Sequence, residues 1–209
     1  MSMDEYYTLK QEADDEYVVK HSRFISYALP VQTQEEAVAF INRIRAKHWD
    51  ATHNVYAYVL RDGQIKRYSD DGEPQGTAGM PVLDVLLKEE LSDCCVVVTR
   101  YFGGILLGGG GLVRAYSHSA KLGVDAAQKI KMALCVRASC SCDYGFYGKL
   151  SAMIPEAGGT IENTDFTDRV TVGFTIPQGL YESFCAAVFD ASLGKVTPTE
   201  QEKLYAPAK

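Results

Sequence analysis

The sequence lacks the features of a membrane-spanning or secreted protein. No apolar run approaches the roughly 20 residues that a membrane helix needs. The amino terminus, MSMDEYYTLK, is acidic and has no apolar core, so it does not have the pattern of a secretory signal. We therefore expect a cytoplasmic protein without a membrane partner.

Motifs that would assign a catalytic or cofactor-binding function are absent as well. The glycine-rich segments have neither the Gly-Lys-Ser/Thr ending of a Walker loop nor the G-x-G-x-x-G pattern of a dinucleotide site. The histidines show no H-x-x-x-H or H-E-x-x-H spacing, which disfavours a zinc hydrolase, and no serine stands in a G-x-S-x-G elbow. The motifs assign no catalytic residue, no metal ligand and no cofactor, and they leave open whether any reaction is catalysed.

The cysteines form no C-x-x-C pair. Cys94 and Cys95 are adjacent, so in a strand they would point to opposite faces. Their apolar flanks favour reduced, buried thiols in a cytosolic protein. Cys140 and Cys142 would share one strand face, which leaves a metal or redox role open. The other two cysteines are Cys135 and Cys185.

The charge balance restricts the choice of partners. The chain has 209 residues and a formal net charge of -6. With a boundary between residues 131 and 132, where the pattern of elements changes, each half carries -3. A negative net charge favours solubility and disfavours indiscriminate binding to polyanions. Any contact with nucleic acid would therefore need a local patch.

The first half has the pattern of a mixed sheet-and-helix domain. Residues 17–31 are predicted to be extended, and Thr33 with Glu36 forms a capping box that starts a helix. Residues 53–60 are apolar on both faces, so we expect that strand to be covered on both sides. Further strands are expected at 65–69 and 94–102, and further helices near Pro81 and after Gly111.

The second half has a different pattern. Apolar residues alternate along 134–142, and a short helix then closes at Gly158 and Gly159. A hairpin, a second helix and a last extended piece follow, which gives the order of the ferredoxin-like split motif, β-α-β-β-α-β. We therefore expect an α+β protein of two domains, residues 1–131 and 132–209.

Two glycine-rich segments each precede a predicted helix. The first contains Gly76, Thr77 and Gly79, and the second runs from Gly108 through Gly109 and Gly110 to Gly111. Helix starts present unpaired amides and a positive dipole end, and glycines let an anion approach the backbone. Arginine suits such an anion, and Arg100 and Arg114 flank the second segment. The pattern indicates an anion cradle, with tight packing as the alternative.

Three carboxylates gather in the loop before the first of these helices. Asp70, Asp71 and Glu73 could share a proton or bind Mg²⁺. We favour loop architecture or a protein contact, because aspartates cap turns and carboxylates can hold an arginine such as Arg67 or Arg100. His53, at a strand start, is interpreted as a hydrogen-bonded structural group more readily than as a base.

Two aromatic residues follow Arg100 at the end of its strand. Tyr101 and Phe102 could stack on bases, as in proteins that bind single strands. Core packing is the more common use of such residues.

These segments together resemble the IMPACT family, whose bacterial members are the YigZ-like proteins. The resemblance rests on DATHNVYAY (50–58), SDDGEPQGTAGMPVLDVL (69–86) and VVVTRYFGGILLGGGGLVRAYS (97–117). The last contains the Arg-Tyr-Phe-Gly-Gly signature, in which Gly103 and Gly104 follow Phe102. KHSRF (20–24) also fits the start of the family's first domain. The likeness covers about residues 1–128.

The resemblance implies a fold and a cellular process. The family's first domain is similar to the second domain of a ribosomal small-subunit protein and to domain IV of elongation factor G, and the appended domain is similar to domain V of that factor. By analogy this implies a translation-linked or RNA-contacting role. Eukaryotic relatives regulate translation by binding an activator of a stress kinase. Those relatives carry a different extra domain, which this chain lacks, so we do not transfer kinase regulation to it.

Three hypotheses of function follow. We favour a non-enzymatic cytosolic protein that contacts RNA, the ribosome or a translation factor. The alternatives are a small-molecule phosphate-binding enzyme and a module that docks on a protein through residues 69–81. The sequence leaves the oligomeric state open. The predicted anion- or partner-binding residues are His53, Asp70, Asp71, Glu73, Gly76, Thr77, Gly79, Arg100, Tyr101, Phe102, Gly103, Gly104, Gly108, Gly109, Gly110, Gly111 and Arg114.

Three consequences can be tested, the first of them directly in a structure. The two glycine-rich helix starts should face the same side of the domain, with open amides. Arg100→Ala and Arg114→Ala should weaken binding with modest loss of stability. Gly109→Val should be severe, because a side chain would block either the backbone conformation or the bound anion.

Overall fold

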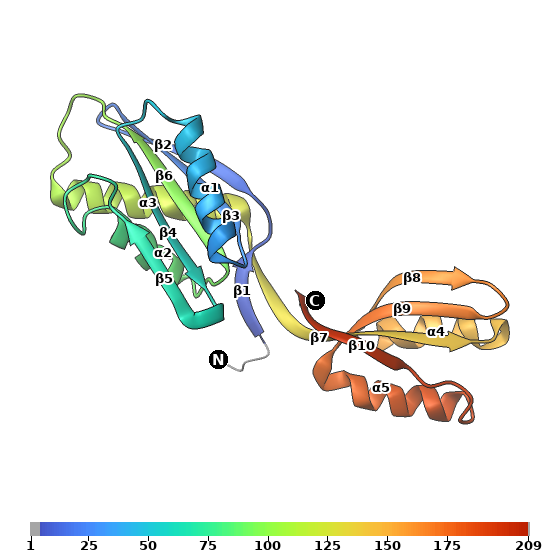
Figure 1. The fold of residues 1–209 in the computed structure, drawn as a ribbon. Coiled ribbons are helices and arrows are strands. Elements are labelled where there is room, and N and C mark those ends of the chain that lie inside the picture. Colours follow the sequence, from blue (N-terminus) through green and yellow to red (C-terminus); the bar gives the residue numbers. More distant parts are fainter. Residues whose placement is uncertain (1–4, 209) are drawn as a thin grey trace. The chain divides into compact units, whose positions relative to one another are not determined.

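The computed structural model describes residues 5–208, and Figure 1 shows their fold. The chain forms two compact units, which we call the N-terminal unit (Tyr6–Lys131) and the C-terminal unit (residues 132–208 with Glu5). Within residues 5–208 the fold is α+β, with five α-helices and two five-stranded sheets. No helix in this range is long and apolar enough to cross a membrane. The segment examined above for a secretory signal begins with residues 1–4, outside the described part.

The N-terminal unit contains one antiparallel sheet with the strand order β2-β3-β6-β4-β5. The short 3-10 helix η1 (Asp62–Gln64) joins its last two strands in sequence. The strands are β2 (Ala13–Val19), β3 (Ser22–Pro30), β4 (His53–Leu60), β5 (Ile65–Ser69) and β6 (Cys94–Tyr101), and the helices are α1 (Gln34–Lys47), α2 (Gly79–Lys88) and α3 (Gly109–Ala127).

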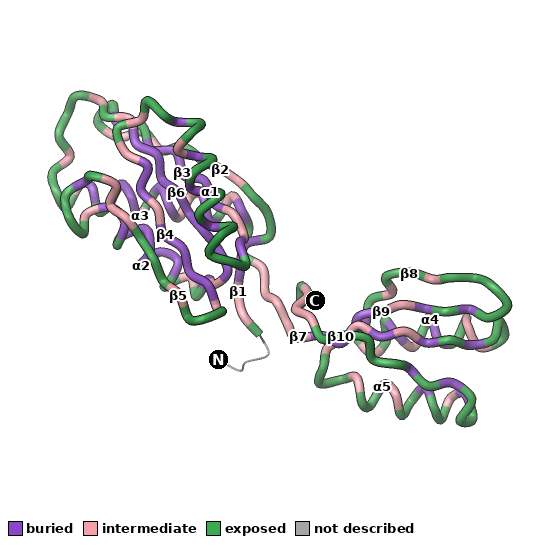
Figure 2. Tube along the Cα trace, viewed as in Figure 1, coloured by how far each residue is buried: buried purple, intermediate pink, exposed green. Residues whose placement is uncertain are grey.

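Both faces of this sheet are covered, as the apolar pattern of residues 53–60 predicts. Val55 and Ala57 of β4 pack in a core under α2 and α3, whereas Tyr58 and Leu60 pack in a second core under α1. Figure 2 shows the central strands as the most deeply buried part of the unit. The β-branched run of β6 is the middle strand of the sheet, as an uninterrupted apolar pattern of this kind favours.

Local sequence explains the start of α1. The hydroxyl of Thr33 accepts a hydrogen bond from the amide of Glu36 at 3.2 Å, as the capping box predicts. The Glu36 carboxylate accepts from the amide of Gln32 at 2.7 Å, one residue before the position that the motif specifies. The cap is therefore confirmed on one side and shifted by one residue on the other.

The prediction of one extended segment over residues 17–31 is wrong in one respect. The chain turns back within it, because β2 ends at Val19 and β3 begins at Ser22. Lys20 and His21 form the turn with φ values of 46° and 62°. A turn with two positive φ values normally contains Gly or Asn, and the absence of both residues hid it in the sequence. The strand β1 (Glu5–Leu9) was not predicted either.

The C-terminal unit follows the predicted order of elements. The sheet that contains its strands has the order β1-β7-β9-β8, and β10 pairs with β7 over Met132–Ser139, on the side opposite β9. Two helices, α4 and α5, pack on its apolar core through residues such as Leu150 and Phe184. The elements are β7 (Lys129–Cys142), α4 (Tyr144–Glu156), β8 (Thr160–Phe166), β9 (Val170–Pro177), α5 (Gln178–Ala191) and β10 (Thr199–Pro207).

The cysteines are free thiols, and all except the half-buried Cys185 are buried. Cys94 packs in the core under α2 and α3, and Cys95 packs in the core under α1, so their predicted opposite orientation is confirmed. Burial raises the pKa of the Cys140 thiol to about 12. This thiol therefore stays protonated at neutral pH, which keeps it unreactive.

Candidate functional site

The two glycine-rich segments lie side by side at one end of the N-terminal unit's central strands. A Cβ built on Gly109 would lie 3.8 Å from the methyl carbon of Thr77, so the segments touch. Beside the second segment is a hollow of about 400 Å³, which we call the α3 pocket. Its lining residues are Thr52, His53, Glu73, Pro74, Arg100, Phe102, Leu106, Leu107, Gly108, Gly109 and Leu112.

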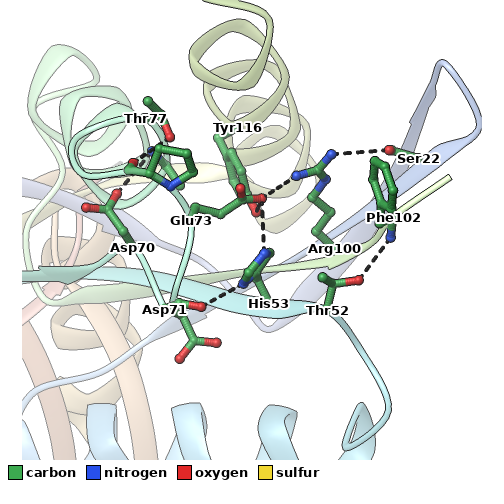
Figure 3. A network of polar contacts seen from close by, with 12 residues as sticks. Ser22, Thr52, His53, Asp70, Asp71, Glu73, Thr77, Arg100, Phe102 and Tyr116 are labelled. Atoms are coloured by element: carbon green, nitrogen blue, oxygen red, sulfur yellow. Dashed lines mark hydrogen bonds and ion pairs between the residues drawn. The ribbon is translucent and has the colours of Figure 1, made fainter. Parts of the chain in front are cut away.

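Glu73 is the centre of the polar contacts at the base of the pocket (Figure 3). Its Oε1 accepts hydrogen bonds from Nη1 of Arg100 at 2.5 Å and from the hydroxyl of Tyr116 at 2.8 Å. The exposed fractions of the Glu73 and Arg100 side chains are 4% and 6%. A buried ion pair of this kind is stable only while both partners and their hydrogen bonds are present. The pair therefore belongs to the architecture of the site as well as to its lining.

Two further groups hold this ion pair in place. Burial, followed by the charge of Glu73, raises the pKa of Tyr116, so its hydroxyl remains a donor at neutral pH. The hydroxyl of Ser22 accepts from Nη2 of Arg100 at 3.4 Å and from the amide of Gly103 at 3.1 Å. Gly103 is required here, because a Cβ would come within 2.0 Å of the backbone of His21. The glycine signature thus lets the strand end approach the β2–β3 turn.

His53 is oriented by the backbone of the acidic loop. Its Nδ1 lies 2.7 Å from the carbonyl oxygen of Asp71, which can only accept, so Nδ1 carries a proton. Nε2 then lies on the other side of the ring, 3.8 Å from Oε1 of Glu73. This arrangement fits the predicted structural role of His53, and it also presents a second nitrogen to the pocket.

Asp70 fills the helix start that the sequence predicts to be open. Its carboxylate accepts from the amides of Gly76 at 2.9 Å, Ala78 at 3.1 Å and Gly79 at 2.8 Å. The chain therefore supplies its own anion at the start of α2, where the helix dipole favours negative charge. The expectation of open amides at this helix fails for that reason, and Asp70 serves the loop architecture.

Asp71 points away from the pocket toward α1. Its carboxylate accepts from Arg45 at 2.7 Å and from the amide of Asn54 at 2.7 Å. The three carboxylates of the loop are thus separated, each with its own partners. No group of three or more His, Cys, Asp or Glu side chains is arranged to hold a metal ion within residues 5–208. The observed contacts are those of a braced loop, and the arginines that it holds are Arg45 and Arg100.

The start of α3 differs from that of α2. The residue before it, Gly108, has φ 73° and ψ 164°, a conformation essentially confined to glycine. No side chain caps this helix, and the amides of Gly109, Gly110 and Gly111 have no hydrogen-bond acceptor among the described residues. Unbonded amides are expected at the starts of both helices, and of these two only the start of α3 has them.

Gly109 and Gly110 are surrounded by open space. The Cβ position of Gly109 meets only Thr77, and that of Gly110 meets only Nη1 of Arg114, each at 3.8 Å. Neither residue has a positive φ. The backbone conformation at Gly109 therefore does not require glycine. The prediction that Gly109→Val would block that conformation is wrong. Any severe effect has to come through a bound group.

Tyr101 and Phe102 separate at the strand end. Phe102 lines the pocket with an exposed fraction of 45%. Tyr101 lies on the face of the sheet under α1, where its hydroxyl contacts Nδ1 of His48 at 2.9 Å and donates to Asp50 at 3.1 Å. The strand alternation that separates Arg100 from Tyr101 also removes Tyr101 from the site. Only Phe102 is placed to contact a ligand of the pocket.

His48 joins two tyrosines beneath α1 and is predicted to make stability depend on pH. Its Nε2 lies 2.7 Å from the hydroxyl of Tyr27. Burial lowers the pKa of His48, and the charge of Lys47 lowers it further, while Asp50 acts in the opposite direction. Below the ordinary histidine pKa of about 6.5, the unfolded chain binds this proton more readily. Stability present above that pH is therefore lost as the pH falls through the lowered pKa.

Urea unfolding between pH 7.5 and pH 4.5 measures this effect. The slope from one proton approaches about 1.4 kcal/mol per pH unit. A His48→Gln variant, which keeps polar atoms near both tyrosines, is expected to lose that part of the slope. Equal slopes in the two proteins would contradict the prediction.

Several other residues complete the site. Thr77 donates its hydroxyl to the carbonyl of Pro74, and Gly76 and Gly104 take positive φ values in exposed turns. Arg114 is exposed and forms no ion pair with a described residue. The sequence did not indicate Tyr116 as a partner of Glu73, or Ser22 as a partner of Arg100. The helical spacing of Leu112, Ala115 and Tyr116 places Tyr116 on a buried helix face but indicates no polar role for its hydroxyl.

Two known domain families match this chain. The Impact N-terminal domain matches residues 20–124, and a domain of unknown function, DUF1949, matches residues 140–195. The IMPACT family member YvyE of Bacillus subtilis is 37% identical over 201 residues, which cover 96% of this chain and 93% of YvyE. YigZ of Escherichia coli is 34% identical over 181 residues, or 85% of this chain and 89% of YigZ.

A solved structure is similar as well. A crystal structure described as that of a hypothetical protein has a TM-score of 0.62 and 32% sequence identity to this chain. The match covers 96% of this chain and 98% of that one.

Proposed function

Because the chain belongs to the IMPACT family, we propose that it is a translation-linked binding protein of the cytoplasm that contacts RNA, free or in the ribosome. The contact is made by the glycine-rich and arginine-bearing rim of the α3 pocket. The observation that carries the proposal is the uncapped start of α3 beside the unpaired Arg114. These groups place a patch of positive charge on a chain whose formal net charge is -6.

The exposed side chains around this patch fit the same proposal. Phe102 and Leu106 have exposed fractions of 45% and 81% at the edge of the pocket. An aromatic ring next to a positive groove is the combination that single-stranded nucleic acids bind. The net negative charge limits non-specific affinity, so recognition depends on this patch.

The alternatives receive less support from the contacts. Asp70, Asp71 and Glu73 each hold groups of the chain itself, so residues 69–81 offer a braced surface in place of a cluster of accessible carboxylates. This weakens docking through the charges of that loop. It also weakens phosphate chemistry assisted by Mg²⁺, which needs carboxylates that can reach the ion.

The proposal extends to the fold. We propose that the N-terminal unit is similar to domain IV of elongation factor G, and that the C-terminal unit is ferredoxin-like and similar to domain V. The strand order β10-β7-β9-β8 with two helices supports the second likeness. A likeness of fold supports a role on the ribosome only by analogy.

Arg114→Ala tests the function. We expect RNA affinity to fall by about tenfold, since one charge-assisted contact to a phosphate is lost. The slope of log K against log salt concentration should decrease in magnitude by about 1, the value for one phosphate contact. The measurement is fluorescence anisotropy with single-stranded RNA, together with co-sedimentation with purified ribosomes at several salt concentrations.

A matched control is available on the same unit. Arg67 on β5 is also exposed, and among the described residues its guanidinium donates a hydrogen bond only to the carbonyl of Lys66. Arg67→Ala should leave binding unchanged, and both variants should unfold within about 0.5 kcal/mol of the parent. If the parent chain associates with neither RNA nor ribosomes at low salt, the proposal fails. Association with a translation factor alone would favour the protein-partner alternative.

A further inference from the structure

The α3 pocket combines an apolar wall, a polar floor and an anion-binding edge in one hollow of about 400 Å³. We propose that it binds one unpaired nucleotide of an RNA strand, with the base against Phe102 and a phosphate on the first turn of α3. The inference rests on the proposed RNA contact and adds the position, the size and the chemistry of a subsite. A volume of this size is at the lower end of the range for small-molecule sites, so it suits a single nucleotide.

The edge of the pocket is suited to a phosphate. Gly109, Gly110 and Gly111 direct unbonded amides from a 19-residue helix. Amides in that position, with the helix dipole behind them, bind phosphate oxygens. The guanidinium of Arg114 lies beside them, with Nη1 3.8 Å from the Cβ position of Gly110. The start of α2 cannot bind the same group, because the carboxylate of Asp70 occupies it.

The glycines themselves are an independent observation. Gly109 and Gly110 lie in helical backbone with room for a Cβ, and a glycine there weakens the helix relative to alanine. Neither packing nor backbone strain accounts for them. Close approach of a bound group to the backbone does, because each missing Cβ leaves the amide accessible.

The floor of the pocket contains an unsatisfied buried group. Arg100 has an exposed fraction of 5% and lines the pocket, and its Nε, which is itself shielded from solvent, has no hydrogen-bond partner among the described residues. Such groups are rare because an unpaired buried donor is unfavourable. His53 and Glu73 line the pocket as well, and Oε2 of Glu73 accepts no hydrogen bond from a described residue. Polar side chains at this position match the edge of a nucleobase better than they match a purely apolar group.

The wall of the pocket is suited to the base itself. Phe102, Leu106 and Leu112 line it, and the ring of Phe102 is accessible from solvent. A base that is already unpaired can stack there without disrupting a duplex. A phosphate alone would leave this wall unused, and an apolar peptide side chain would leave the amides of α3 unused. The nucleotide is the ligand that uses all three parts.

The test compares the full chain with a Gly109→Ala/Gly110→Ala variant. Binding is measured by anisotropy with labelled single-stranded RNA hexamers, with the same hexamers containing one abasic nucleotide, and by thermal shift with nucleoside monophosphates and with inorganic phosphate. We expect the variant to be at least as thermally stable as the parent chain and to bind the hexamer about tenfold more weakly. The abasic hexamer should bind the parent chain more weakly by a similar factor.

A matched glycine lies in the other unit. Gly179 is the second residue of α5, as Gly110 is of α3, and a Cβ there would meet nothing within 4 Å. Gly179→Ala should gain similar helix stability without loss of affinity. Equal loss of affinity in the two variants would overturn the assignment of the site to α3.

The outcomes separate this inference from the proposed function. RNA binding by the parent chain that is unaffected by the double variant and by the abasic nucleotide overturns the nucleotide subsite and leaves the RNA contact intact. A thermal shift with inorganic phosphate equal to that with nucleoside monophosphates shows a phosphate site alone and also overturns it. Absence of RNA and ribosome binding removes the proposed function and the subsite together.

Discussion

Arg100→Ala is expected to lower the free energy of unfolding of the N-terminal unit by about 3–5 kcal/mol. The variant leaves the Glu73 carboxylate buried without its guanidinium partner, and one hydrogen bond to Oε1 remains, from the hydroxyl of Tyr116. A lone buried charge is far less favourable than the intact pair. The modest loss predicted from the sequence for this arginine is therefore revised, whereas the prediction for the exposed Arg114 stands.

The measurement is urea unfolding of the single variants Arg100→Ala and Glu73→Gln and of the double variant Arg100→Met/Glu73→Gln. Each single variant leaves one buried group without its charged partner, so both should be strongly destabilised. The double variant should recover much of the loss, because neutral side chains of similar volume can replace a buried pair. A loss below about 1 kcal/mol in Arg100→Ala would show that solvent reaches Glu73 and would contradict the buried pair.

Phe24→Ala is expected to have an effect of similar size by a different mechanism. Phe24 is fully buried, with its ring edge-on to Tyr116 at 5.1 Å between centroids. Its removal leaves a cavity under α3, which lowers the free energy of unfolding by about 3–5 kcal/mol. Because the same ring lies 5.4 Å from the guanidinium carbon of Arg100, the polar network should loosen as well.

Phe102 provides the matched comparison. Its ring also lies 5.4 Å from the guanidinium carbon of Arg100, but it is half-exposed at the edge of the pocket. Phe102→Ala should change the unfolding free energy by less than about 1 kcal/mol while weakening RNA binding. Chemical unfolding and anisotropy on both variants measure the contrast. A small stability loss for Phe24 or a large one for Phe102 would show that the burial of the two rings does not determine their roles.

Much of the fold follows from local sequence patterns. The apolar residues on both faces of β4 require covering layers on both sides, and helices cover both. Thr33 specifies the start of α1 through a contact three residues away. These elements are predictable because period and capping depend on neighbours in the chain. The Lys20–His21 turn escaped prediction, because the pairing of β2 with β3 imposes backbone angles that neither residue favours by itself.

The site was predictable in position more than in detail. The glycine segments indicated two helix starts, and both are present, close together. The sequence could not show that Asp70 would turn its carboxylate toward the start of α2. The path of the loop from Asp70 to Ala78 sets that direction. Nor could it show that Tyr116, 43 residues from Glu73, donates to the same oxygen as Arg100. Contacts over such separations depend on the packing of α3 on the sheet and have no local signature.

The acidic loop joins several elements of the N-terminal unit through its side chains. Asp70 holds α2, Asp71 holds Arg45 of α1, and Glu73 holds Arg100 of β6 and Tyr116 of α3. One short segment thus ties the layers on both sides of the sheet to its central strand. A molecule arriving at the pocket meets a surface whose shape is already fixed, so capture loses little motional freedom in the protein. Recognition at this surface should accordingly resemble the fitting of rigid bodies, with complementarity of outline deciding which partners are retained.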